Sequence, residues 1–172
     1  MRIMKKLLYV CLAIVLASCT KNQEEEFSAI NMDNVVSFAV VNANNEDLLD
    51  SSNPNAIDLT TLRVYYLIDG VKTAANTGSD NPNGFYKYRV KQANDSYKYR
   101  LRVFLNPTVT NQQPKNTTII EWNNANNDTL EARYRVYKNS PVSLLEFWEN
   151  GQSRWKVQDQ NTNPTRLITL VK

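Results

Sequence analysis

Short runs of alternating apolar and polar residues fill the chain from about residue 33 onward, and this pattern most constrains the fold. A period of two places the apolar side chains of a strand on one face, whereas no apolar period of about 3.6, typical of a helix, persists. Clusters of Asn, Asp, Pro and Gly separate the runs, as turns separate strands. We therefore expect an all-β domain. The predicted strands cover residues 35–42, 60–68, 71–74, 85–91, 97–105, 117–122, 129–137, 143–149, 152–157 and 166–171.

Turn residues between these runs predict how neighbouring strands connect. Asp69 and Gly70 form a two-residue hairpin signal, because such a turn needs residues that accept a positive φ. Asn150 and Gly151 form a second signal of the same kind. Many short strands joined by tight turns predict an antiparallel β-sandwich, with a small β-barrel as the alternative.

Residues 1–18 have the layout of a secretory signal peptide, with basic residues before an uninterrupted apolar run at 7–17. That run is too short to span a bilayer, which takes about 20 residues. It closes with Leu-Ala-Ser-Cys, which resembles the lipobox of bacterial lipoproteins and ends at Cys19. The resemblance implies that Cys19 becomes the first residue of the mature chain and carries a diacylglyceryl thioether and an N-acyl group such as palmitate.

A polar segment at 19–32 follows and predicts a lipidated, disordered tether ahead of a single domain at 33–172. Its acidic residues, Glu24 to Glu26, resemble the signal that exports lipoproteins of Bacteroidota to the cell surface. We therefore expect a lipid anchor in the outer membrane with the domain at the cell surface. Retention at the periplasmic face is the alternative, because the acidic run starts later than is typical.

The composition of the mature chain argues against the commonest catalytic sites. The sequence has no His, Cys11 lies in the signal peptide and Cys19 is the acylated residue, so no free thiol or imidazole remains. The formal charge of +3 disappears with Arg2, Lys5 and Lys6, which leaves equal numbers of basic and acidic residues. We expect neither an enzyme, nor a cofactor, nor a nucleic-acid partner.

The predicted hairpin at 85–105 carries the clearest two-faced pattern in the chain. Alternation predicts tyrosine and aliphatic side chains on one face and six cations on the other. Such a face would bind a polyanion, for example a sulfated or uronic-acid glycan, or would be the solvated side of a half-buried sheet. The cations are Lys87, Arg89, Lys91, Lys98, Arg100 and Arg102.

Tryptophan residues near the C-terminus suggest either core packing or a platform for sugar rings. Pairing across the turn at Asn150 and Gly151 predicts that Trp148 and Trp155 share one face with Glu146. Core packing is the favoured interpretation, because that face is the more apolar one. In a core, the Glu146 carboxylate would have to lie at the rim or pair with a buried cation. If exposed, the three residues would instead form a sugar-binding face. Trp122 is expected in the core.

Two Asx-rich segments, 47–58 and 80–84, contain oxygen ligands of the kind that calcium prefers. Neither has an EF-hand spacing, and Asx residues are common in turns because they bond their own backbone. We therefore expect no metal site. The loop at 43–58 is longer than most connections, which makes it a place to look for function.

Beside the lipobox and the acidic tether, the chain has three further segments of note: Asp47 to Asp50 with Asn53 and Pro54, Tyr65 to Gly70, and Glu149 to Gly151. Together these features resemble small Bacteroidota lipoproteins of uncharacterised function. That resemblance implies an immunoglobulin-like or transthyretin-like sandwich and supplies no catalytic residues. The leading hypothesis is a non-catalytic binding or accessory module for a glycan or an envelope protein. A structural subunit that adds a strand to a neighbour is the alternative. A glycoside-active enzyme with paired carboxylates is the third.

Overall fold

The computed structural model describes residues 33–75, 81–108, 115–123, 126–137 and 140–172. Each of the predicted strands is present, with bounds that differ from the expected ones by a few residues. The elements are β1 (Val35–Val41), β2 (Arg63–Ile68), β3 (Val71–Ala74), β4 (Phe85–Lys91), β5 (Tyr97–Phe104), β6 (Asn116–Asn123), β7 (Asn126–Tyr137), β8 (Ser140–Glu149), β9 (Gln152–Lys156), the 3₁₀ helix η1 (Val157–Asn161) and β10 (Leu167–Val171).

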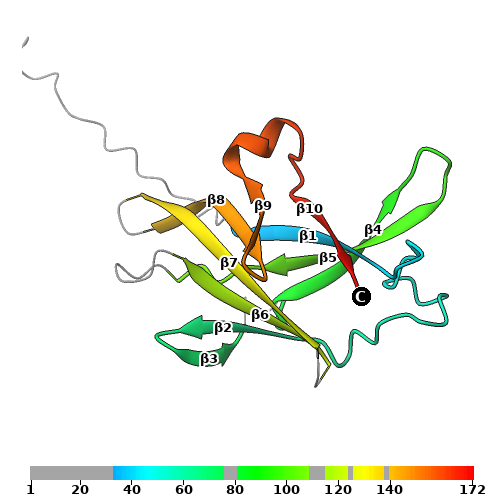
Figure 1. Ribbon diagram of the computed structural model, residues 1–172, viewed down its shortest axis with the longest axis horizontal. Helices are drawn as coiled ribbons and strands as arrows, with labels where there is room; N and C mark the ends of the chain where they lie inside the picture. The colour runs from blue at the N-terminus through cyan, green and yellow to red at the C-terminus, as the bar shows by residue number, and fades with distance from the viewer. Residues whose placement is uncertain (1–32, 76–80, 109–114, 124–125, 138–139) are drawn as a thin grey trace, which may run out of the picture. The chain divides into compact units, whose positions relative to one another are not determined.

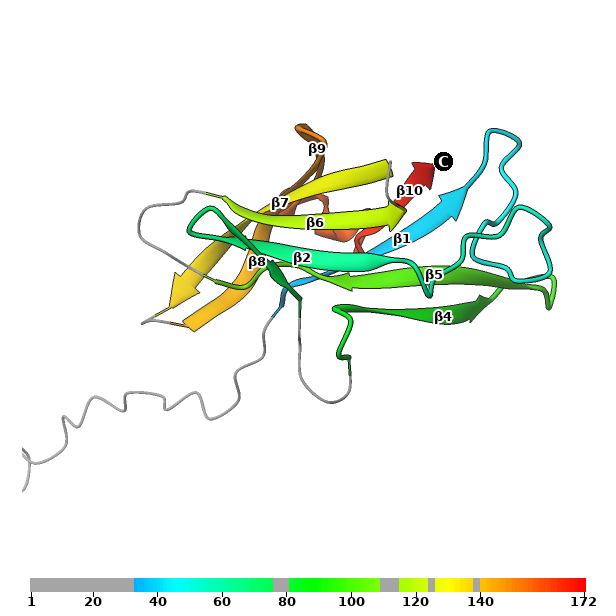
Figure 2. The same ribbon diagram turned by 90° about the horizontal axis from the view of Figure 1, so that it is seen from below.

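The strands form two open sheets that pack face to face (Figures 1 and 2). The four-stranded sheet has the order β10-β1-β5-β4, and the six-stranded sheet has the order β3-β2-β6-β7-β8-β9. The fold is therefore a β-sandwich, as predicted, and not a closed barrel.

One strand pair departs from the expected antiparallel arrangement. β10 runs parallel to β1, with Ser37 opposite Leu167 and Val41 opposite Val171. The first and last strands of the domain thus lie side by side and start at the same end of the sheet. At their other end the backbone N–H of Lys172 donates to the carbonyl of Val41 at 2.9 Å.

The core lies between the two sheets and is built from the apolar face of each strand. Phe38 of β1 and Phe147 of β8 meet across the layers with ring centroids 6.1 Å apart. Both are fully buried, as are Leu101 of β5 and Ile120 of β6. Because an apolar core of this kind stabilises a domain without cross-links, the absence of thiols from the expected mature chain is no obstacle to folding.

Both predicted two-residue hairpins are confirmed by their backbone angles. Asp69 and Gly70 have φ of 50° and 80° between β2 and β3. Asn150 and Gly151 have φ of 49° and 80° between β8 and β9. Two consecutive positive φ angles define the turn type whose twist matches that of the flanking strands.

Candidate functional site

The prediction that six cations share one face of the β4–β5 hairpin is wrong. Strand pairing sets Tyr86 opposite Arg102 and Tyr88 opposite Arg100, so tyrosines and cations face the same way. Lys98, Arg100 and Arg102 point to the outer side of the four-stranded sheet. The other cations share the face of Leu101 and Val103, and they are Lys87, Arg89 and Lys91.

The length of the loop between β4 and β5 explains this error. Gln92 N–H donates to the Ser96 carbonyl at 2.8 Å, which leaves three residues in the loop. The last of them, Asp95, has a φ of 62°. The face predicted from the sequence required a four-residue turn at residues 93–96, and a three-residue loop changes the pairing by one residue relative to that turn. A slip of one residue moves every side chain of a strand to the opposite face.

Cations on the inner-facing side of the hairpin already have partners. Lys87 Nζ donates to the Leu49 carbonyl at 3.2 Å. Arg89 lies over the ring of Tyr97, and Lys91 forms an exposed ion pair with Asp95 at 2.6 Å. These contacts give the three side chains local structural roles.

The prediction that Trp148 and Trp155 share a face is also wrong. Trp148 pairs with Ser153 as expected, but Trp155 pairs with Phe147, because Arg154 forms a β-bulge in β9. Trp155 is therefore buried in the core, where its indole N–H donates to the Asn163 carbonyl at 3.1 Å. Trp122 is also buried, as predicted.

Trp148 and Glu146 lie together on the outer face of the six-stranded sheet. Glu146 accepts from Arg133 at 3.0 Å, from Lys156 at 3.2 Å and from Ser153 at 3.2 Å. Burial alone would raise the pKa of Glu146, but these partners outweigh it and hold the pKa below its usual value. Lys115 Nζ covers the ring of Trp148 at 4.0 Å. The tryptophan and the carboxylate thus already have protein partners.

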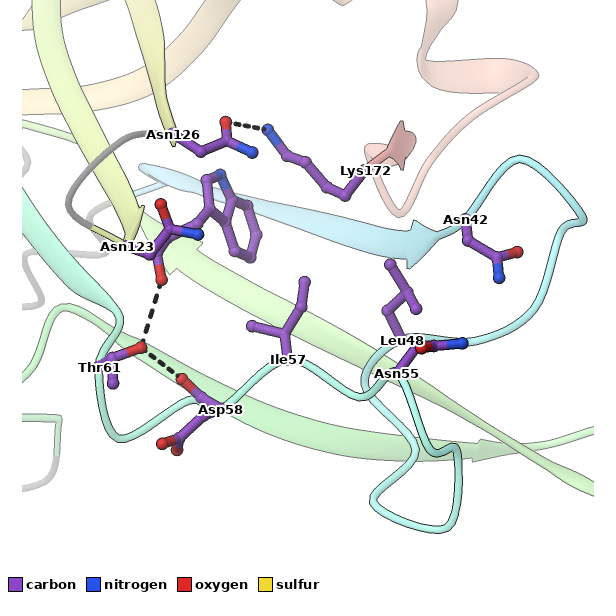
Figure 3. Close-up of a pocket in the computed structure, with 10 residues that line it drawn as sticks. Asn42, Leu48, Asn55, Ile57, Asp58, Thr61, Asn123, Asn126 and Lys172 are labelled. Carbon is purple, nitrogen blue, oxygen red and sulfur yellow. Dashed lines mark hydrogen bonds between the residues drawn. The ribbon is translucent and has the colours of Figure 1, made fainter.

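A cavity of about 590 Å³ lies at the end of the sandwich where β1 ends. Its volume is in the range of small-molecule sites. The loop at 43–58 supplies one wall, and the ends of β6, β7 and β10 supply the other (Figure 3). The cavity is lined by Asn42, Leu48, Asn55, Ile57, Asp58, Thr61, Trp122, Asn123, Asn126 and Lys172.

The cavity combines an apolar floor with amide groups at its rim. Leu48 and Ile57 point from the loop toward Asn126 and Lys172 (Figure 3). Asn126 accepts from Lys172 Nζ through its Oδ1 at 3.3 Å, which leaves its Nδ2 to donate. The exposed side chain of Asn55 makes no hydrogen bond to the described part of the chain. Primary amides carry both donors and an acceptor, so this rim can bind groups that both donate and accept.

A buried ion pair holds the wall of the cavity. Asp128 accepts from Lys172 Nζ at 2.6 Å and from the indole N–H of Trp122 at 2.7 Å through one oxygen. Its other oxygen accepts from Asn150 at 2.9 Å. Burial alone would raise the pKa of Asp128, but these hydrogen bonds outweigh it, and the pKa lies below its usual value. The C-terminal lysine is thereby fixed at the cavity rather than free.

The carboxylates of the loop at 43–58 cap their own turns. Asp47 accepts from the backbone N–H of Leu49, Asp50 from that of Ser52, and Asp58 from that of Thr60, each at 2.9 Å. Hydrogen bonds from the side chain and backbone of Thr60 lower the pKa of Asp58. Among the described residues no group of three His, Cys, Asp or Glu side chains is placed to hold a metal ion. Asp80, in the second Asx-rich segment, lies outside the described residues.

Sequence reasoning identified the loop at 43–58 by its length but missed the strand residues that complete the cavity. Asn126 and Lys172 lie more than 60 residues beyond that loop, and no local pattern links them to it. The parallel placement of β10 beside β1 brings Lys172 to this end.

Comparisons with protein-family models, curated proteins and solved structures find no match to this chain. Cys19, the signal peptide and the acidic tether lie outside the described residues. In the described part of the chain, no helix has the length and apolar character that crossing a bilayer requires.

Proposed function

We propose that this protein is a lipid-anchored, non-catalytic binding module of the bacterial cell envelope and that its ligand is a carbohydrate chain. The observation that carries the proposal is the end cavity, with its apolar floor and amide-rich rim. Sugar rings present C–H faces that pack on apolar side chains, and hydroxyl groups that donate and accept hydrogen bonds. Asn side chains match hydroxyl groups in both roles.

The cavity lies at the end of the domain opposite to where the chain enters it, which suits ligand binding by a domain anchored at Cys19. The chain enters the domain at Asp33, which pairs with Arg166 just before β10. The cavity lies at the opposite end of β1, a strand of seven residues that spans about 23 Å at 3.3 Å per residue. A domain anchored through residues 19–32 would therefore carry its cavity at the end away from its attachment point.

The cavity supports binding better than glycoside hydrolysis. Hydrolysis of glycosides takes two carboxyl groups about 5–10 Å apart, one of them with a raised pKa. Among the described residues that line the cavity, Asp58 has the only carboxylate side chain, and hydrogen bonds lower its pKa. It is thus suited to accept hydrogen bonds rather than to deliver a proton.

Strand addition, the other alternative, has less support from the sheet edges. β3 has four residues, and β9 and β10 have five each. β4 is longer, but it carries Lys87, Arg89 and Lys91, and charged side chains on an edge oppose pairing with another strand.

Glycan-array binding of the purified full chain in detergent tests the carbohydrate proposal. We expect a defined set of glycans to bind, and Asn126→Ala combined with Asn55→Ala to lower their affinity about tenfold, because two amide contacts are lost. Asn127→Ala is the matched control, since Asn127 is the next residue of β7 and does not line the cavity. The absence of any binding, or an equal loss in the control, would contradict the proposal.

Metabolic labelling with radioactive palmitate tests the anchor. The wild-type chain is expected to incorporate label and to fractionate with outer membranes. Cys19→Ala removes the only thiol at the predicted acylation site and should abolish both. Retention of the label in that variant would refute the lipoprotein proposal.

A further inference from the structure

We infer that the ligand is an acidic carbohydrate; that it is a carbohydrate rests on the proposed function. The structure assigns its carboxylate or sulfate groups to a row of cations on the outer face of the four-stranded sheet. This cation row consists of Lys98, Arg100 and Arg102 of β5. It differs from the six-cation face expected from the sequence, because its members come from one strand.

The cation row follows a single strand. Its members alternate along β5, so neighbouring positions are about 6.8 Å apart at 3.4 Å per residue. The row runs along the strand toward the hairpin loop. An evenly charged, extended chain presents anionic groups along a line of this kind. A bilayer surface instead offers its charges across a plane, and three cations gain only about 1 kcal/mol each from it.

Arg102 is held in place by tyrosines on its own face. Its guanidinium donates to the hydroxyl of Tyr86 at 2.7 Å and lies over the ring of Tyr88, 5.0 Å from the centroid. Tyr88 in turn donates to the hydroxyl of Ser37 at 3.1 Å. The Nε of Arg102 is buried and has no hydrogen-bond partner among the described residues. These contacts orient the cation without neutralising it.

Arg100 and Lys98 retain most of their donors. Arg100 donates one N–H to the carbonyl of Tyr99 at 2.7 Å, and its other N–H groups make no hydrogen bond to the described residues. Lys98 is exposed and forms no ion pair or hydrogen bond with the described part of the chain. An Arg beside a Lys supplies both a planar donor fork and a mobile charge for carboxylate or sulfate oxygens.

A hollow of about 170 Å³ lies beside the cation row. Lys98 and Arg100 line it together with Ala39 and Val41 of β1 and Thr169 of β10. Asp47 also lines the hollow, but both of its oxygens accept backbone N–H groups, from Leu49 and from Tyr99, each at 2.9 Å. Asp47 forms no ion pair with Lys98 or Arg100, and the described residues offer these two cations no other carboxylate partner.

Matched acidic and neutral polysaccharides test the inference with the full chain. Dextran sulfate and polygalacturonate are compared with dextran and with methyl-esterified polygalacturonate at 0.1 M salt. We expect each acidic polymer to bind at least about tenfold more tightly than its neutral counterpart, with an affinity that falls as salt rises. Lys98→Gln with Arg100→Gln should abolish this preference.

A control pair on the same hairpin separates the cation row from net charge. Arg89→Gln with Lys91→Gln removes the same charge from the opposite face and should change the affinity less than threefold. An equal loss of affinity in both pairs of variants would overturn the inference. It would also be overturned if Lys98→Gln with Arg100→Gln abolished binding to phosphatidylglycerol vesicles and left binding to acidic polysaccharides unchanged. If the Lys98→Gln and Arg100→Gln double variant does not fold, Lys98→Gln alone repeats the test, because Lys98 is exposed.

The outcomes also separate this inference from the proposed function. Equal binding of neutral and acidic polymers, sensitive to Asn126→Ala, would overturn the acidic ligand and leave the carbohydrate proposal standing. Preference for acidic polymers that survives Lys98→Gln and Arg100→Gln would overturn the assignment to the cation row. Failure of every polysaccharide to bind would overturn both.

Discussion

Cations on the outer faces of the two sheets differ in whether they have carboxylate partners. On the six-stranded sheet, Lys115 lies 3.2 Å from Glu131, and Arg133 lies 3.0 Å from Glu146. Lys72 likewise pairs with Glu121. On the four-stranded sheet, Arg102 packs on tyrosine rings, and the described residues offer no carboxylate as ion-pair partner to Lys98 or Arg100.

This difference separates a solvated face from a candidate binding face in a chain whose formal net charge is only +3. Paired cations are screened by their partners and attract little from solution. Unpaired cations on a regular strand keep their field and their donors. The charge of the whole chain is therefore a poor guide to ligands, and the pairing of each cation is a better one.

The largest expected effect tests whether the two tryptophans really lie on opposite sides of the six-stranded sheet. Trp155→Ala should lower the free energy of unfolding by about 3–5 kcal/mol, because it empties a buried site. Trp148→Ala should cost less than about 1 kcal/mol, since it removes a half-exposed ring and its contact with Lys115. Chemical denaturation measures both. Equal losses of unfolding free energy in the two variants would indicate that both rings lie on the same face of the sheet.

The next effect tests the pairing on the six-stranded sheet. Glu146→Ala should cost about 2 kcal/mol, because it removes hydrogen bonds to two cations and leaves Arg133 and Lys156 without their shared carboxylate. Asp95→Asn is the control, since Asn accepts the positive φ of 62° at this position and the variant removes only an exposed ion pair with Lys91, which contributes little. A change as small as that of the control would show that Glu146 is not a structural carboxylate.

The same carboxylate predicts a dependence of stability on pH. The pKa of Glu146 is lowered by folding, so its contribution is fully present above the unfolded pKa of about 4.3 and is lost as pH falls through the folded pKa. The free energy of unfolding should therefore fall less steeply in Glu146→Gln than in the wild-type chain between pH 5 and pH 2, by less than about 2 kcal/mol. Identical pH profiles would contradict the assigned shift.

The smallest expected effect concerns the cation row itself. Arg100→Gln should change the free energy of unfolding by less than about 0.5 kcal/mol, because the side chain has no carboxylate partner to lose. Raising the salt concentration should reduce even that difference. A loss above 1 kcal/mol would place Arg100 among the residues that stabilise the fold and weaken its assignment as a ligand contact.

Local patterns predicted the strands, whereas the faces of two hairpins depended on features that alternation does not reveal. Strand bounds follow from apolar periodicity, which acts over a few residues. The face of Trp155 depended on the bulge at Arg154, and that of the β5 cations on a loop that ends at Asp95. Each adds or removes a single residue in the pairing, which inverts the face of a whole strand.

The candidate cavity was less predictable still, because it assembles side chains from separate parts of the chain. Only the loop at 43–58 left a signal, through its length. The contribution of Lys172 depends on the parallel return of β10 beside β1, and local sequence carries no trace of that choice of neighbour.

Side-chain amide NMR during a glycan titration tests the carbohydrate site most directly. We predict that the side-chain amide signals of Asn55 and Asn126 shift progressively as a bound glycan is added, while that of Asn127 stays in place. Asn127 is the next residue of β7 and does not line the cavity, so its side-chain signal reports changes that are not specific to the site. Shifts of equal size at Asn126 and Asn127, or none at Asn55 and Asn126 despite binding, would contradict the account.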